Sequence, residues 1–208
     1  MSTLQVAAPG RKVLVGWVGG MNASLSLARD LSLSAQYELL QQFVPELQTL
    51  RGAHTHTTDS GHLVEAGMSL EIVARFTIPG APALHAPPTS TPVFGLDVLA
   101  ATDGSSAVRI RVNCSAPAID ASCHIHVDAT AQGGDLYRAP LFFANGAEPP
   151  WHVAMHAIVD HSIIELIVNN RTAIAAITSP PSEHHNSVRL VGADSLQPSM
   201  DYWKLDAI

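Results

Sequence analysis

The stretch AIVDHSIIELIVNNRTAI, residues 157–174, places two runs of branched apolar residues on either side of Asp160-His161-Ser162. The second run stops at Asn169-Asn170-Arg171, where residues that favour tight turns come together. Short runs rich in Val and Ile between such turn residues are typical of strands. The stretch therefore predicts consecutive antiparallel strands that contribute to a core.

Asp160, His161 and Ser162 also have the three residue types of a nucleophilic relay, which is the enzymatic alternative for this corner. Adjacent residues of a strand point to opposite faces, so they cannot form the required chain of hydrogen bonds. Asp and Ser are good turn residues because their side chains bond to nearby backbone N–H groups. We interpret the three residues as a turn, and Glu165 as a strand residue that faces water or a cross-strand partner.

The same strand pattern extends along most of the chain. In residues 107–114, Val108, Ile110 and Val112 alternate with Arg109 and Arg111, as expected for a strand with one buried face and one wet face. The other predicted strands are 11–18, 70–78, 94–101, 123–130, 151–159, 163–168, 171–178, 187–193 and 201–207. Many short strands separated by turn residues favour an all-β fold, an antiparallel two-sheet β-sandwich, over any βαβ arrangement.

Three segments depart from this strand pattern. Residues 34–52 contain Leu39, Leu40 and Phe43 at helical spacing, but Pro45 interrupts them, so a short turn of helix and an extended linker remain open. Residues 51–69 are polar and lack apolar rhythm, and we place a domain boundary nearby. Residues 79–92 are rich in proline and are expected to form a stiff surface loop.

Composition narrows the classes of partner. The net charge is −7, and the Lys and Arg residues are scattered singly along the sequence, which argues against nucleic acid as a partner. No apolar run reaches the roughly 18 residues that span a bilayer, and the N-terminal residues do not form a signal peptide, so no membrane partner is expected.

The cysteine and asparagine patterns leave the cellular compartment open. Cys114 and Cys123 fall on neighbouring predicted strands, where they are either free or bonded to each other. Glycosylation triplets begin at Asn22, Asn113 and Asn170, which indicates a secretory history or chance occurrence.

Five blocks of the sequence, in order, resemble the C-terminal portion of glycoside hydrolase family 32, the invertases, inulinases and fructosyltransferases. They are GRKVLVGWV (10–18), LSLARDLSL (25–33), LLQQFVPELQTLRG (39–52), LEIVARF (70–76) and VDHSIIELIVNNRTAI (159–174). The resemblance implies a five-bladed β-propeller that carries the active site, followed by a β-sandwich. Residues 1–52 would then be the last strands of a truncated propeller and a linker, and residues 60–208 would be the sandwich.

The resemblance implies that the catalytic residues lie outside this chain. The family's N-D-P, R-D-P and E-C elements, which supply the two catalytic carboxylates and a sugar-holding aspartate, do not occur in it. Arg29-Asp30-Leu31 begins like R-D-P, but its neighbours match the P-R-E-L block of the last blade, and we expect an ion pair or a strand end at the module junction. No catalytic residue is assigned, and roughly 300 further residues of propeller are expected before Met1.

Substrate contact through this chain rests on a single residue. By resemblance, Trp17 is a candidate for stacking on a furanose ring, and the alternative is a tryptophan of the propeller core. Sucrose or a fructan would bind through the missing propeller, no cofactor is expected, and the family implies a secretory or extracellular location. The alternative function is a free-standing carbohydrate-binding or structural module. Its candidate stacking residues are Trp17, Tyr37, Tyr137, Trp151, Tyr202 and Trp203.

Three pairs of histidines raise the question of a metal site. Histidines at 54 and 56, at 124 and 126, and at 152 and 156 fall in pairs on one strand face, yet one pair is too few ligands for zinc. We therefore expect exposed strand histidines and no metal site.

Four apolar residues are placed to form the seam between propeller and sandwich: Leu39, Phe43, Val44 and Leu47.

Overall fold

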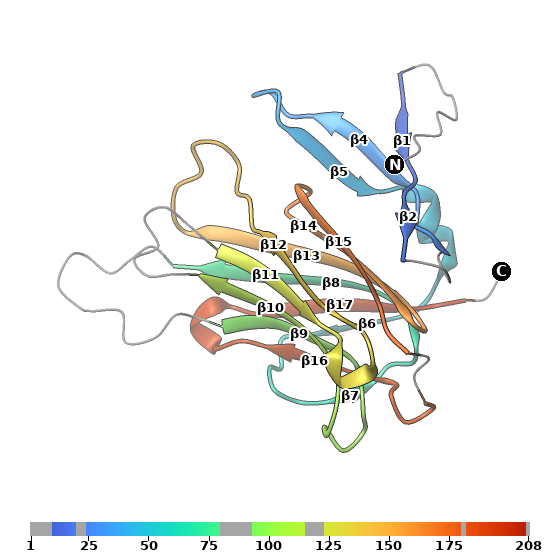
Figure 1. Ribbon diagram of the computed structural model, residues 1–208. Coiled ribbons are helices and arrows are strands. Elements are labelled where there is room, and N and C mark those ends of the chain that lie inside the picture. Colours follow the sequence, from blue (N-terminus) through green and yellow to red (C-terminus); the bar gives the residue numbers. More distant parts are fainter. Residues whose placement is uncertain (1–9, 20–23, 80–92, 115–122, 180–181, 207–208) are drawn as a thin grey trace.

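The structure, a computed structural model, describes residues 10–19, 24–79, 93–114, 123–179 and 182–206 (Figure 1). Within these residues, strands form most of the regular structure, together with the short 3-10 helices η1 (Pro45–Leu50), η2 (Thr130–Gln132) and η3 (Asp194–Leu196). No helix of the described part is long and apolar enough to cross a membrane. The predicted all-β class is confirmed.

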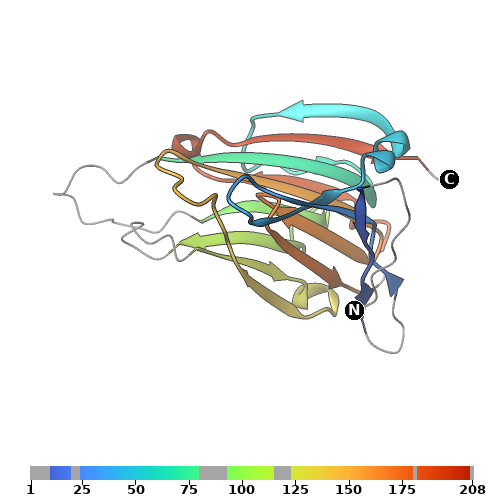
Figure 2. The same ribbon diagram turned by 90° about the horizontal axis from the view of Figure 1, so that it is seen from above.

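Two antiparallel sheets form a sandwich, as predicted. Sheet I has the order β12 (Leu136–Pro140), β11 (Cys123–Asp128), β10 (Val108–Cys114), β9 (Val93–Ala100), β16 (Ser187–Val191) and β7 (Val64–Glu65). Sheet II has the order β15 (Thr172–Ile177), β14 (Ile163–Val168), β13 (Trp151–Asp160), β8 (Ser69–Ile78), β17 (Ser199–Leu205) and β6 (Arg51–Thr57). Figure 2 shows the two sheets as stacked layers.

The core lies between the two sheets and follows the alternation of the sequence. In β10, Val108, Ile110 and Val112 are completely buried, whereas Arg109 on the opposite face is exposed. The rings of Phe76 from sheet II and Phe94 from sheet I meet inside the sandwich with centroids 4.7 Å apart. This apolar interior is the main source of stability, because burial of apolar surface contributes roughly 25 cal/mol per Å².

The N-terminal strands form a separate layer on the outer face of sheet II (Figure 1). β4 (Arg29–Leu33) lies between β1 (Lys12–Leu14) and β5 (Leu39–Phe43), and β2 (Trp17–Val18) pairs with β3 (Ser24–Leu25). We call these strands, residues 10–43, the N-terminal unit. η1 follows β5 after one residue and leads directly into β6, the edge strand of sheet II.

The turns of the opening stretch confirm the strand-and-turn prediction. β13 ends at Asp160, His161 and Ser162 form the turn, and β14 begins at Ile163. His161 has φ of 51°, and Asn169 and Asn170, between β14 and β15, have φ of 51° and 55°. Asn tolerates this left-handed region better than most residues, which explains the tight second turn.

Several elements differ from the sequence-based expectations. Residues 39–43 are a strand, so the helical spacing of Leu39, Leu40 and Phe43 was misleading, and only η1 after them is helical. Residues 51–57, expected to lack regular structure, form β6, and β12 was not predicted. The proline-rich loop lies mostly outside the described residues. Position 79 alone of that loop is described, and it is exposed.

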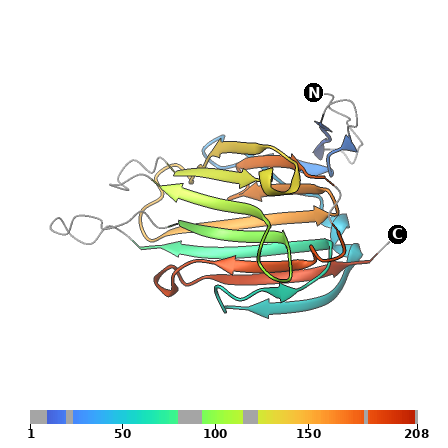
Figure 3. The ribbon, with the colours of Figure 1, turned by 60° about the horizontal axis from the view of Figure 1, so that its bottom comes forward.

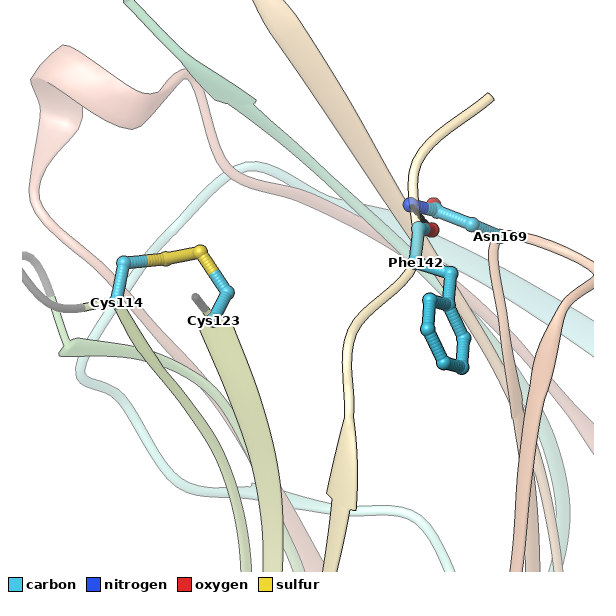
Figure 4. Close-up of a disulfide and its surroundings, with 4 residues drawn as sticks. All are labelled: Cys114, Cys123, Phe142 and Asn169. Carbon is cyan, nitrogen blue, oxygen red and sulfur yellow. Dashed lines mark hydrogen bonds between the residues drawn. A yellow bond between two sulfur atoms is a disulfide. The ribbon is translucent and has the colours of Figure 1, made fainter. Parts of the chain in front are cut away.

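A disulfide joins the two cysteines, which settles the alternative that the sequence left open. Cys114 and Cys123 are directly opposite each other at the ends of β10 and β11, with Cα atoms 3.9 Å apart (Figure 4). Figure 4 also shows Asn169 beside Phe142, where the Asn169 side-chain amide donates a hydrogen bond of 3.2 Å to the Phe142 carbonyl. Loop 141–150 is thus tied to the turn between β14 and β15.

Candidate functional site at the seam between the N-terminal unit and sheet II

An apolar cluster holds the N-terminal unit against sheet II. Phe43 of β5 is 6% exposed and packs on Ile158 of β13 and Ile167 of β14. Leu27, Leu47, Ala173 and Leu205 surround these three side chains. We call this cluster and the polar contacts around it the seam.

The seam prediction was correct for three of its four residues. Phe43 and Val44 are buried, and Leu47 is half-buried in the cluster. Leu39 is 59% exposed: it shares a face of β5 with Phe43, but it lies at the far end of the strand, beyond the apolar cluster.

A buried ion pair crosses the seam. Arg29 Nη2 of β4 lies 2.7 Å from Glu165 Oε2 of β14, and these side chains are only 10% and 3% exposed. The backbone N–H of Leu27 donates to Glu165 Oε1 at 2.5 Å, so both carboxylate oxygens are bonded. The expectation that Glu165 faces water or a cross-strand partner is wrong, because the N-terminal unit covers that face of β14. The predicted ion pair at the module junction is confirmed at Arg29.

Polar contacts at the turn between β14 and β15 extend the seam. Arg171 Nη2 lies 2.8 Å from Glu38 Oε2. The Gln41 backbone N–H donates to the Asn170 carbonyl at 2.8 Å, and its side-chain amide donates to the Arg171 carbonyl at 3.0 Å. The turn is therefore held in place by β5.

Glu71 of β8 forms a second buried charged group beside the seam. Arg51 donates two hydrogen bonds to its carboxylate at 2.7 and 2.6 Å, and His156 Nε2 lies 2.7 Å away. Burial would raise the pKa of Glu71, but the bonds to Arg51 and His156 outweigh it and hold that pKa at about 2. Glu71 is thus ionised at neutral pH and cannot serve as a general acid, which needs a raised pKa.

A groove of about 490 Å³ opens beside the seam, where Glu71 and Glu165 lie. Leu25, Leu27, Leu47, Leu50, Ile158, Ile163 and Leu205 form its apolar walls, and Ser24, Ser69, Glu71, Asp160, His161, Glu165 and Asp206 supply polar groups. The two buried carboxylates in it are each paired with an arginine. Neither of these two carboxylates is therefore free for acid–base chemistry.

The corner at Asp160 does not form a nucleophilic relay. Asp160 Oδ1 and Ser69 Oγ both approach the same ring atom, His161 Nδ1, at 2.8 and 3.4 Å. A relay needs the carboxylate and the hydroxyl on different ring nitrogens, so that a proton can pass through the ring. Asp160 and His161 are also largely exposed, with side chains 71% and 61% accessible. The turn interpretation is confirmed.

The histidine pairs are largely surface features. His54 and His56 of β6 are exposed and both contact Asp201 Oδ1, at 3.1 and 2.9 Å. His152 is exposed, whereas His124 and His126 of β11 are half-buried, as is His156, which lies against Glu71 and Phe43. In the described ranges, no group of three or more His, Cys, Asp or Glu residues is placed to hold a metal ion.

The candidate stacking residues have unequal accessibility. Tyr202 belongs to the core, and Trp203 is covered by His54, stacked at 4.7 Å, and by Arg51, 4.0 Å from its ring centre. Trp17 and Tyr37 are 68% and 84% exposed, so their rings are open to solvent in this chain. Sugar contact by Trp17 remains a prediction.

The family model for the C-terminal domain of glycosyl hydrolases family 32 matches residues 41–204. The chain belongs to this family. The matched region begins in β5 and ends in β17, so it includes the seam residues Phe43 and Glu165. The resemblance drawn from the five sequence blocks is confirmed. No curated protein matches the chain.

Solved structures of family 32 enzymes share the fold. Fructan 1-exohydrolase IIa from Cichorium intybus, in complex with 1-kestose, has a TM-score of 0.72 at 17% identity over 94% of this chain and 46% of its own. Sucrose-6-phosphate hydrolase from Lactobacillus gasseri has a TM-score of 0.69 at 13% identity, over 95% and 39%. Exo-inulinase from Aspergillus awamori has a TM-score of 0.68 at 14% identity, over 97% and 41%. The chain thus spans less than half the length of these family members.

Sequence reasoning missed the buried carboxylate of Glu71 beside the seam and assigned the wrong surroundings to that of Glu165 within it. Glu71 lies in LEIVARF and Glu165 in IIELIV, each a lone acid inside an apolar strand. A carboxylate in such a run needs a buried partner, since an unpaired buried charge is costly. A lone acidic residue in an apolar strand therefore marks both positions as buried and paired. It does not identify the partners, Arg51 and Arg29.

Proposed function

We propose that this chain is the non-catalytic sandwich end of a family 32 enzyme that hydrolyses or transfers β-fructofuranosyl units of sucrose or a fructan. In this proposal residues 1–52 belong to the last propeller blade and linker, and residues 60–208 form the sandwich, to whose sheet II the connecting strand β6 also adds. The seam carries the proposal: Phe43, Arg29 and Gln41 of the N-terminal unit are bonded or packed to sheet II by contacts typical of a permanent interface.

The role of the sandwich in this proposal is to cover a blade. A propeller blade has an open edge and an apolar flank, and unpaired edges invite association with other chains. Ile158 and Ile167 pack against Phe43 of β5, and Glu165 neutralises the buried Arg29. Catalytic carboxylates would come from the preceding blades.

The first experiment tests catalysis. The purified 208-residue chain, incubated with sucrose and with inulin, is expected to release no fructose above a blank. The longer product, expressed from the transcript that includes the sequence upstream of Met1, is expected to release it. Fructose release by the short chain, or an upstream sequence without N-D-P, R-D-P and E-C elements, would contradict the proposal.

The second experiment separates this role from that of a free-standing carbohydrate-binding module. Titration calorimetry with sucrose and with inulin is expected to give no heat of binding for the chain at millimolar ligand. Binding that is lost in Trp17→Ala and kept in Tyr37→Ala, a control at a comparably exposed aromatic, would favour the binding module instead.

A further inference from the structure

The outer face of sheet I gathers arginines that are far apart in the sequence. Register places Arg189, Asp97, Arg109 and Asp128 side by side on β16, β9, β10 and β11. In the neighbouring row, Arg111, His126 and Arg138 lie side by side on β10, β11 and β12. These residues face away from the core, because their neighbours along each strand are buried. We call this surface the arginine face.

The arginine face is positive in a negative chain. Its four arginines outnumber its two aspartates by two charges, before His124 or His126 is counted, whereas the whole chain has a formal net charge of −7. The pKa of His126 is lowered, first by its partial burial and then by the charges of Arg138 and His124. This direction is expected where positive charges repel a further proton.

Two of the arginines are held in ion pairs and two are exposed, although Arg109 has Asp97 and Asp128 as its cross-strand neighbours. Asp97 is completely buried, and it pairs with both Arg111 and Arg189. Arg111 also donates to the Leu96 carbonyl at 2.6 Å, so its guanidinium is held in place. Arg109 and Arg138 are exposed, and among the described residues neither forms an ion pair.

The face is open and broad. The N-terminal unit lies on sheet II, on the opposite side of the sandwich, and Figure 3 shows no other described strand across sheet I. From Arg189 on β16 to Arg138 on β12 there are four strand spacings, or about 19 Å at roughly 4.8 Å each. A compact anion such as phosphate would reach only one or two of these guanidinium groups.

We propose that the arginine face binds an anionic polysaccharide, whose carboxylate or sulfate groups recur along an extended chain. Guanidinium groups bind such oxyanions through parallel hydrogen bonds as well as charge. The disulfide on the same strands, between Cys114 and Cys123, belongs to an oxidising compartment, where such polysaccharides occur. Nucleic acid fits less well, because neither row contains a Phe, Tyr or Trp side chain on which unpaired bases could stack.

The test measures binding of the 208-residue chain to immobilised polygalacturonate, dextran sulfate, inulin and a DNA duplex. The wild-type chain is expected to bind one or both of the anionic polysaccharides at low salt, more weakly at about 150 mM salt, and not to bind inulin. Preference between the two identifies carboxylate or sulfate as the group recognised.

Variants locate the binding surface. Arg109→Glu with Arg138→Glu is expected to weaken polysaccharide binding at least about tenfold, with unchanged circular dichroism, because both side chains are exposed. A small fall in melting temperature is expected, since Arg109→Glu places a carboxylate opposite Asp97 and Asp128. The matched control, Lys12→Glu with Lys204→Glu, makes the same change in net charge at exposed positions outside sheet I and is expected to retain binding.

Three results would overturn the proposal. They are no binding to either polysaccharide, equal loss in the two double variants, and tighter binding to DNA than to both polysaccharides.

Discussion

The Arg29–Glu165 pair makes a quantitative prediction about the seam. Replacing Arg29 by Met leaves the Glu165 carboxylate in a site where its side chain is 3% exposed, with the Leu27 N–H as its one remaining partner in the described part of the chain. Breaking a buried pair in this way typically costs about 3–5 kcal/mol. Glu165→Gln keeps an acceptor for Leu27 but leaves the arginine charge facing a neutral amide, and we expect a loss of about 2–3 kcal/mol.

The double variant Arg29→Met with Glu165→Gln removes both charges and keeps the Leu27 bond. Its loss of stability is therefore expected to be smaller than the sum of the two single losses by about 2 kcal/mol. Urea unfolding followed by tryptophan fluorescence gives the free energies of unfolding, and hydrogen exchange at the Leu27 amide reports local opening of the seam. A coupling energy below about 0.5 kcal/mol, together with unchanged exchange at Leu27, would refute the reasoning.

Four further predictions concern individual side chains. The pKa of Glu71 is held at about 2 against an ordinary 4.5, so its ion pairs stabilise the fold above pH 4.5 and this stability is lost as the pH falls toward 2. The free energy of unfolding of Glu71→Gln, measured against pH, should lack that decline. A decline parallel to that of the wild-type chain would contradict the prediction. Replacing Cys114 and Cys123 by Ala should cost about 2.5 kcal/mol, from the nine-residue separation that the bond closes, and an unchanged melting temperature would exclude this. Phe43→Ala should lower the free energy of unfolding in urea by about 3 kcal/mol and make the η1 region more sensitive to protease. If the variant and the wild-type chain are cleaved equally slowly there, apolar packing of Phe43 does not hold the seam together. Trp17→Ala should change the unfolding free energy by less than about 0.5 kcal/mol, and a larger loss would mean that this ring is packed.

The strands that were predicted correctly are those in which apolar and polar residues alternate because one face of the strand packs in the core. β10 and β13 each have one face in the core, so apolar residues recur at every second position and the pattern can be read directly. β6 was missed because it is an edge strand whose outward side chains include His54 and His56, and none of its residues is fully buried. A strand that buries little carries no apolar signal.

The seam and the arginine face required information that no local pattern contains. Arg29 and Glu165 are 136 positions apart, and Arg109 and Arg189 belong to strands that become second neighbours only through β9. Along the sequence these arginines are single and scattered, which led to the expectation that nucleic acid is not a partner. Strand order and register are set by the whole fold, and they decide which scattered charges become neighbours.

The connection between β5 and β6 has a mechanical consequence. Val44 and the six residues of η1 are the whole of the link, and both of its ends are anchored, by Glu46 to Arg11 and by Arg51 to Glu71. A hinge needs a few unrestrained backbone torsions, and this link has Pro45 at its start and enters a paired strand at its end. The N-terminal unit and the sandwich should therefore tumble and vibrate as one rigid body, without a hinge motion between them.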